Sequence, residues 1–164
     1  MAKDWTKEKI KLPVTLNAKE RKKIGMIIIE HIINRTAAGL DKRNKEFPNY
    51  TQTYADKKGV GTGDVDLILT GEMLDSLEVV STKKGEVVIG YGDPSDELAG
   101  KVEGNRRGSY GGEPNRKKAR DFLGIDPTEL DLLVSSYQAD ENLNGDPGFN
   151  VEDVLKELLA SETK

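Results

Sequence analysis

Hydrophobic and polar residues follow patterns along the chain that predict one long helix, one hairpin and several shorter elements. The long helix is predicted to begin at Asn17, which with Glu20 forms a capping box, and to stop at Gly39. At 100° per residue, one face carries Ile24, Ile27, Ile28, His31 and Ala38. The opposite side carries Met26, Ile29 and Ile33, with Ile32 between the two. A helix that is apolar on two sides is expected to be covered twice, by this chain or by another copy of it.

The β-structure is predicted from clusters of valine and isoleucine. Val79 and Val80 lead through the turn Lys83-Lys84-Gly85 into Val87, Val88 and Ile89, which is the pattern of a β-hairpin. Residues 118–125 are predicted to form a third strand. Shorter helices are expected at 51–58, 70–77, 94–102 and 126–138 and, after a polar break at 140–150, at 151–160. Residues 104–115 contain four glycines and no aliphatic residue, which predicts a long mobile loop.

These elements predict an α+β fold, with a long N-terminal helix packed on a small antiparallel sheet. Residues 1–138 are expected to form this domain, with residues 1–16 as an N-terminal arm. Residues 139–164 are expected to form a C-terminal extension with a short amphipathic helix. The chain has 164 residues, of which 35% are hydrophobic and 33% charged, so we expect one domain with a small core.

Charge is distributed unevenly, although the formal net charge is only −4. Residues 1–60 carry a net charge of +7, residues 61–100 carry −7, residues 101–120 carry +5 and residues 121–164 carry −9. Such blocks can pair within one fold, between copies of the chain, or with an outside polyelectrolyte. The stability of such a lean, charged subunit is expected to depend on assembly and on salt.

Several classes of protein are disfavoured by the composition. The chain has no cysteine, which removes disulfide scaffolds and thiolate nucleophiles and fits a reducing compartment. Charges are spread through the first residues, which is unlike a secretory signal. The longest uninterrupted apolar run is the four residues Met26–Ile29, far below the ~20 residues needed to span a membrane. We therefore expect a soluble intracellular product without a membrane partner.

Three motifs have the residues of a functional site but not its full pattern. His31, the single histidine, lies within an apolar helical face, so a hydrogen-bonded core or interface histidine is favoured over a catalytic one. The run Gly59-Val60-Gly61-Thr62-Gly63 lacks the spacing of a phosphate-binding loop and is interpreted as a turn. Asp140–Gly145 resembles the start of a calcium loop, but its twelfth position is Val151 and not an acid, and an Asx-rich turn explains it equally well. No catalytic residue, cofactor or metal site is predicted.

The basic block at residues 101–120 is the strongest candidate interaction site. Arginine, glycine and one tyrosine interleave there, which suits contact with phosphates and stacking on a base. The same cations could instead dock against acidic blocks of a neighbouring copy. The candidate contact residues are Glu103, Arg106, Arg107, Arg116, Lys117, Lys118 and Arg120.

The order of the motifs resembles that of a known group of families. The long first helix is followed by Leu69-Thr70-Gly71-Glu72-Met73-Leu74-Asp75-Ser76-Leu77, then by the hairpin ending Val88-Ile89-Gly90, by Ala99-Gly100-Lys101-Val102-Glu103-Gly104, and by Ala119-Arg120-Asp121-Phe122-Leu123-Gly124-Ile125. This order resembles the tail-completion and head–tail joining families of tailed-phage virion morphogenesis, over residues 17–138. Leu98 stands where those families usually have Tyr, and Asp121 replaces the usual Pro.

The resemblance implies a structural subunit of the virion neck that assembles in the host cytoplasm and has no catalytic activity. It implies a homo-oligomeric ring, with six or twelve copies, that joins the portal or connector to the tail terminator or tail tube. The predicted loop would then line the channel or reach the next ring, with possible non-specific contact to DNA. The alternative left open by the residues is a small nucleic-acid-binding accessory protein that uses residues 101–120.

Overall fold

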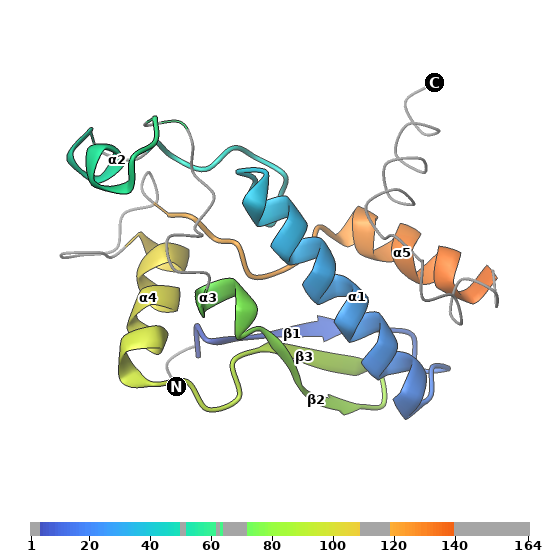
Figure 1. Ribbon diagram of the computed structural model, residues 1–164. Coiled ribbons are helices and arrows are strands. Elements are labelled where there is room, and N and C mark those ends of the chain that lie inside the picture. Colours follow the sequence, from blue (N-terminus) through green and yellow to red (C-terminus); the bar gives the residue numbers. More distant parts are fainter. Residues whose placement is uncertain (1–3, 50–51, 62, 64–71, 109–118, 140–164) are drawn as a thin grey trace, which may run out of the picture.

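Two layers, a long helix and a three-stranded antiparallel sheet, form the centre of the computed structural model (Figure 1). The structure describes residues 4–49, 52–61, 63, 72–108 and 119–139. Within these ranges the fold is α+β, with helix α1 (Ala18–Ala37) packed on the sheet and shorter helices around it, as predicted.

The sheet consists of β1 (Lys7–Lys11), β2 (Glu78–Lys83) and β3 (Glu86–Gly90), in the order β1-β3-β2. The hairpin β2–β3 is confirmed, and its turn contains Gly85 with a φ of 83°, which favours glycine. Its register shifts between Val79 and Ser81, so the pairing is irregular at that point. The sheet therefore has β3 at its centre and both other strands at its edges.

The third strand is not the predicted one. Residues 119–125 form no strand and bend at Leu123 and Gly124, because the carbonyl groups of Phe122, Leu123 and Gly124 accept hydrogen bonds from arginine side chains. The third strand is instead β1, from the segment predicted to be an N-terminal arm, and Ile10 pairs with Val87 in the antiparallel register. The sequence does not predict this strand, because β1 contains three lysines and one glutamate. Its single buried isoleucine gives too little apolar pattern.

Helix α1 begins and ends where the sequence predicts. The Asn17 side chain accepts from the Glu20 backbone N–H at 2.9 Å, and the Glu20 carboxylate accepts from the Asn17 N–H at 3.0 Å. Gly39, with a φ of 86°, follows the C-cap residue Ala38. Both ends are thus fixed by local hydrogen bonding and backbone conformation.

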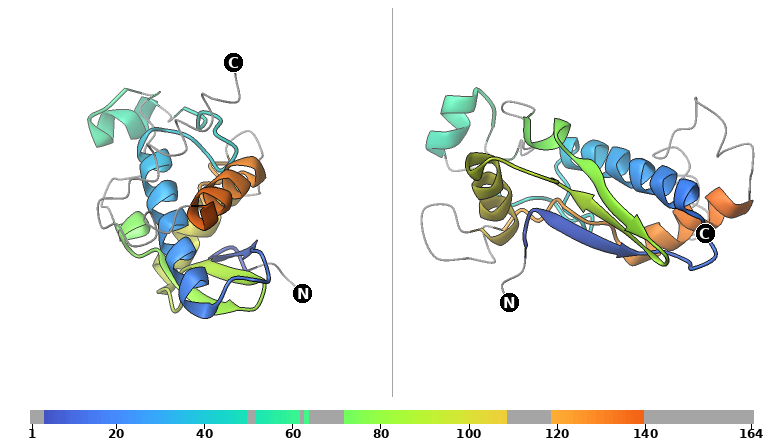
Figure 2. Two further views of the ribbon diagram at one scale, coloured as in Figure 1. Left: turned by 90° about the vertical axis from the view of Figure 1, so that its right-hand side faces the viewer. Right: turned by 90° about the horizontal axis from the view of Figure 1, so that it is seen from below.

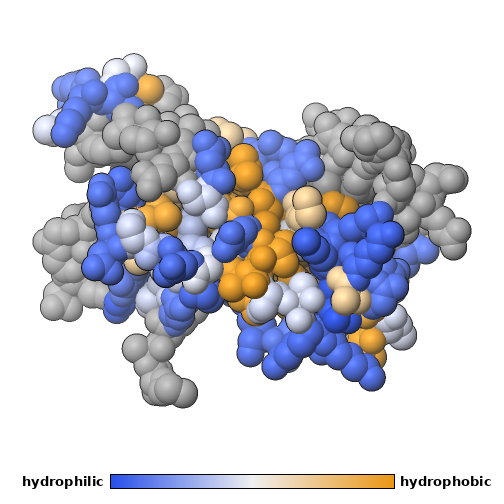
Figure 3. Space-filling view, turned by 60° about the horizontal axis from the view of Figure 1, so that its bottom comes forward, coloured by the Kyte–Doolittle hydropathy of each residue, from blue (hydrophilic) through white to orange (hydrophobic). Residues whose placement is uncertain are grey.

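The core lies between α1 and the sheet. Ile24, Ile28 and Ile32 of α1 are completely buried, as are Val87 and Ile89 of β3. Gly25 allows close approach, because a Cβ at this position would lie 2.9 Å from Val79 Cγ2 and 3.0 Å from Val87 Cγ2. Figure 3 shows hydrophobic residues gathered in a strip on one face of the molecule, with hydrophilic residues on both sides.

The second apolar side of α1 is covered only in part. Ile29 and Ile33 are partly buried against the core, whereas Met26 is 59% exposed. The residues His31 and Arg35 contact the 122–129 region of the same chain. His31 and Arg35 lie on the first apolar face, with Ile24, so this contact covers that face and not the side that carries Met26.

The shorter helices are α2 (Gln52–Lys58), α3 (Glu72–Asp75), α4 (Asp96–Arg107) and α5 (Pro127–Ala139). Each lies within or overlaps a predicted helix. Ser95 caps α4 by accepting from the Leu98 N–H at 3.1 Å, and Asp126 accepts from the Thr128 N–H at 3.0 Å at the start of α5. Figure 2 shows α2 and α5 at opposite ends of the molecule, with α1 between them.

The predicted loop at 104–115 is wrong at its beginning, because residues 104–107 form the last turn of α4. The helix continues there because Val102, Asn105 and Arg106 are buried along it, and Gly108, with a φ of 67°, ends it. The remainder of that loop lies outside the described residues. So do the predicted helix at 151–160 and the Asp140–Gly145 motif.

Candidate functional site

The candidate contact residues do not share one environment. Glu103, Arg106 and Arg107 lie on the second half of α4, and Arg120 lies on segment 119–125. Arg116, Lys117 and Lys118 lie outside the described residues. Arg107 and Glu103 form an ion pair at 2.7 Å, with side chains 35% and 44% exposed. In contrast, the Arg106 side chain is completely buried.

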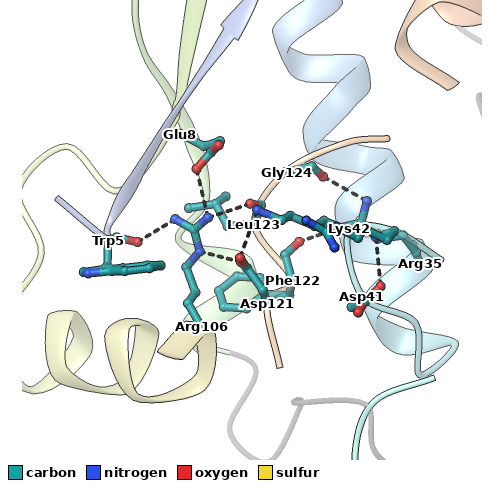
Figure 4. A network of polar contacts seen from close by, with 11 residues as sticks. Trp5, Glu8, Arg35, Asp41, Lys42, Arg106, Asp121, Phe122, Leu123 and Gly124 are labelled. Atoms are coloured by element: carbon teal, nitrogen blue, oxygen red, sulfur yellow. Dashed lines mark hydrogen bonds and ion pairs between the residues drawn. The ribbon is translucent and has the colours of Figure 1, made fainter. Parts of the chain in front are cut away.

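Arg106 joins three parts of the chain (Figure 4). Its Nε donates to Asp121 Oδ1 at 2.6 Å, and its Nη2 donates to Glu8 Oε2 at 2.8 Å. Nη1 donates to the Trp5 carbonyl at 3.0 Å, and Nη2 also donates to the Leu123 carbonyl at 3.1 Å. The guanidinium therefore links α4 to the beginning of β1 and to segment 119–125. Four of the five N–H donors of this buried arginine are thus directed to two carboxylates and two carbonyl groups inside the protein.

Trp5, the single tryptophan, lies against this site. The guanidinium carbons of Arg106 and Arg107 are 5.3 and 5.4 Å from the centroid of its ring. These distances are within the range of cation–π contacts. The ring thus packs against the two arginines at the end of α4 and holds the residues just before β1 beside this helix.

A second arginine holds the other side of segment 119–125. Arg35 of α1 donates through Nη1 to the Gly124 carbonyl at 2.8 Å and through Nη2 to the Phe122 carbonyl. Lys42 adds an ion pair with Asp121 at 3.0 Å, and its backbone N–H donates to the Asp121 carbonyl at 2.9 Å. The buried side chains of Phe122 and Leu123 complete the attachment. We call Arg35, Lys42, Arg106 and Asp121 the arginine junction.

The flanks of residues 109–118 are joined at the same place. The Arg120 N–H donates to the Asn105 carbonyl at 2.6 Å, which connects the end of α4 to segment 119–125. The Arg120 side chain donates to the carbonyl groups of Pro48 and Asn49 at 3.2 and 3.0 Å. Arg120 therefore has a structural role in holding the 48–49 loop, in addition to any contact outside the chain.

Tyr91 lies near the arginine junction and is almost completely buried. Its hydroxyl donates to the Met73 carbonyl, which connects the end of β3 with α3. Burial raises the pKa of Tyr91 well above its usual value, and the positive charge of Arg106 only partly opposes this effect. Tyr91 is therefore neutral at physiological pH.

His31 is a hydrogen-bonded core histidine, as the sequence favours. Its Nε2 lies 2.8 Å from Glu129 Oε2, and both side chains are at least 94% buried. Asn44 Nδ2 donates to Glu129 Oε1 at 2.5 Å, and Asn44 adopts a φ of 62° to reach it. Burial alone would raise the pKa of Glu129, but the hydrogen bond and charge of His31, with Asn44 and Arg35, lower it overall. This cluster attaches α5 to α1 and to the 41–45 turn.

The arginine junction and the His31–Glu129 cluster both hold elements of the fold together. Within the described ranges, no group of three or more histidine, cysteine or acidic side chains is arranged to hold a metal ion. Sequence reasoning selected Arg106 but missed its partners Trp5, Glu8 and Asp121. Glu8 could have been found, because it shares the inward face of β1 with Ile10 and a charge on that face requires a partner.

Comparisons of the chain with protein-family models, with curated protein sequences and with solved structures found no match. The resemblance to phage tail-completion families therefore stays a prediction. Among the helices described here, none combines the length and apolar character needed to cross a membrane.

Proposed function

We propose that this chain is a structural subunit of a tailed-phage neck, which acts in tail completion or head–tail joining by self-assembly into a ring and without catalysis. Its partners would be the portal or connector and the tail terminator or tail tube, and its location would be the virion. The observation that carries the proposal is the meeting of two of the segments on which the resemblance is based. Residues 99–104 belong to α4 and residues 119–125 follow 109–118, and the two are linked through Arg106 and Asp121.

The arrangement of α1 on the sheet also supports the proposal, because it is the architecture that the resemblance implies. The partly covered side of α1, with Met26 exposed, leaves apolar surface that a neighbour would bury. The two described flanks, at the end of α4 and at the start of segment 119–125, are joined by the Arg120–Asn105 and Arg106–Asp121 hydrogen bonds. They bring together two of the motifs that carry the resemblance.

Native mass spectrometry tests the proposal directly. The wild-type chain is measured at low and high salt, alone and with the portal and tail proteins of the same virus. We expect a closed oligomer of six or twelve copies, alone or on a partner. A chain that remains monomeric in every mixture would overturn the proposed function.

A loop replacement tests the role of residues 109–118. We expect a Gly/Ser linker in their place to leave the urea midpoint unchanged, because the flanks are joined by the Arg120–Asn105 hydrogen bond. The same variant is expected to lose docking to the neck partner. A control variant, Glu30→Ala, removes an exposed charge of α1 that is not among the candidate contact residues and should retain docking.

The alternative function is nucleic-acid binding through residues 101–120. Fewer cationic side chains are available to contact phosphates than the sequence suggests. Arg106 is buried and Arg120 holds the 48–49 loop, so Arg116, Lys117 and Lys118 would carry most of the contact. This alternative predicts salt-sensitive DNA binding that weakens when these three residues are neutralised. Unchanged DNA binding in that variant would reject it.

A further inference from the structure

The blocks of opposite charge in the sequence become two opposite ends of the sheet in the structure. Strand β2 begins with Glu78 and ends with Lys83, and these residues pair with Gly90 and Glu86 of β3. At about 3.3 Å per residue, the two ends of β2 are ~17 Å apart. The sheet thus has two ends. We call the one at the β2–β3 turn the hairpin-turn end, and the one where β2 begins and β3 ends the open end.

The hairpin-turn end is basic. Figure 1 and both views of Figure 2 show the first turn of α1 beside the β2–β3 turn. Lys11 adjoins this turn as well, because the Leu12 N–H donates to the Gly85 carbonyl at 2.9 Å. Within the described part of the chain, four exposed lysines at this end form no ion pair, namely Lys11, Lys19, Lys22 and Lys84. Glu86 is already shared by Lys9 and Lys83.

An exposed apolar side chain lies among these lysines. Val14 is 62% exposed and lies over the hairpin turn, because a Cβ on Gly85 would be 3.3 Å from Val14 Cγ1. An apolar centre with a polar rim is the usual arrangement of a protein interface. We call this surface the lysine end.

The open end is acidic. The Glu78 carboxylate accepts from the Gly92 N–H at 3.0 Å, which brings the start of β2 beside the β3–α4 connection. Asp75, Asp93 and Asp96 are exposed there and form no ion pair with other described residues. We call this surface the acidic end. Figure 3 shows hydrophilic residues on both sides of the central hydrophobic strip.

We infer that the lysine end of one copy docks on the acidic end of the next copy, in a head-to-tail contact. Two different surfaces that meet in this way propagate from copy to copy, and they close into a ring when the rotation permits. Opposite charges on the two surfaces favour this pairing and disfavour lysine end against lysine end. The inference rests on the proposed function in one respect, because it names the contact by which the ring is built.

Charge reversal at each end separately tests this contact. One variant carries Lys11→Glu with Lys84→Glu, which cancels the positive charge of the four unpaired lysines at the lysine end. The other carries Asp75→Lys with Asp93→Lys, which cancels the negative charge of the acidic end. We expect each variant alone to self-associate at least about tenfold more weakly than the wild type at low salt, by sedimentation velocity. An equimolar mixture of the two variants should recover the association, because each supplies the charge that the other lacks.

A control variant with Glu30→Lys and Asp131→Lys reverses two exposed charges outside both ends and should associate like the wild type. Where the wild type assembles only on a neck partner, the same variants are compared on that partner.

If both reversed variants assemble as well as the wild type, the contact is wrong while the proposed ring function stands. A wild type that is monomeric with and without partners overturns the function itself. A third outcome is that the wild type is monomeric and binds DNA, and that the Lys11→Glu, Lys84→Glu variant no longer binds it. This outcome would assign the lysine end to nucleic acid.

Discussion

Helix α1 and segment 119–125 are attached to the same core by different chemistry. Helix α1 packs through isoleucine side chains and a close approach to the sheet at Gly25, which are apolar contacts. Segment 119–125 buries Phe122 and Leu123, but its backbone is held by Arg35 and Arg106 from two helices. The first attachment depends on the fit of apolar side chains, whereas the second fails when one charged group loses its partners.

The largest expected effect is at the arginine junction. Arg106→Met leaves Glu8 without this cation and leaves two carbonyl groups without these donors, so we expect the free energy of unfolding to fall by about 3–5 kcal/mol. Urea titration followed by Trp5 fluorescence measures it. Arg107→Ala on the next residue should cost less than about 1 kcal/mol, since its pair with Glu103 is partly exposed. Equal effects of the two substitutions would contradict the importance of Arg106.

The double variant with Arg106→Met and Glu8→Gln sharpens this comparison, because Asp121 keeps its ion pair with Lys42. Since the Glu8 carboxylate is neutralised together with its cation, we expect the double variant to be more stable than Arg106→Met alone. A double variant that is less stable would show that the packing of Arg106, and not its charge, controls this region.

The second effect concerns the attachment of α5 to α1. Glu129→Gln removes a buried charged acceptor and should lower the free energy of unfolding by about 1.5–3 kcal/mol. The pKa of Glu129 is lowered in the folded state, so its contribution is present above its unfolded pKa and is lost as pH falls through the lower, folded value. Urea titrations from neutral to acidic pH should therefore show a shallower loss in Glu129→Gln than in the wild type. If the free energy of unfolding falls equally with pH in both proteins, the assigned role of the Glu129 charge is wrong.

The third prediction compares two helical glycines. Gly25→Ala places a methyl group against Val79 and Val87, and we expect a net loss of about 1–2 kcal/mol despite the better helix propensity of alanine. Gly100→Ala in α4 meets nothing within 4 Å and should gain about 0.5–1 kcal/mol. Thermal unfolding by circular dichroism measures both. A gain at Gly25 would mean that α1 and the sheet are less tightly packed than described.

The smallest effect is expected at Asp4. Hydrogen bonds from Thr6, with the Lys7 ammonium, lower its pKa to about 2. The side chain is 57% exposed, so solvent screening limits the effect of Asp4→Asn to less than about 1 kcal/mol. Its contribution should be lost only as pH falls from about 4 toward 2. A urea midpoint at neutral pH that shifts as much as that of Glu129→Gln would be inconsistent with this exposure.

The same comparison explains which parts of the fold the sequence could predict. The capping box at Asn17, the spacing of the isoleucines and the glycine of the hairpin turn act over a few residues, so α1 and β2–β3 could be recognised from local patterns. The arginine junction depends on residues up to 101 positions apart, such as Arg106 and Trp5, and no local periodicity reports such a contact. For this reason the sequence predicts a strand at 118–125 and does not predict β1.

The candidate site shows a related limit. The composition of residues 101–120 predicted a cationic surface, but it could not distinguish a cation that faces solvent from one that balances buried carboxylates. Arg106 belongs to the second kind because Glu8 and Asp121 converge on it from distant elements. The alternation of Lys7, Glu8, Lys9 and Ile10 contained a signal for this, since it places one carboxylate on the inward face.

The strand order β1-β3-β2 has a consequence for how the chain acquires its structure during synthesis. Strand β1 leaves the ribosome first, but its pairing partner β3 follows only at residues 86–90, whereas β2 and β3 are neighbours in sequence. A loop of that length is costly to close before native contacts compensate, so the hairpin and α1 are expected to form before β1 joins them. During this interval the lysines at alternate positions of β1 would discourage pairing with a wrong strand. The first segment to be made is therefore expected to be the last to complete the sheet.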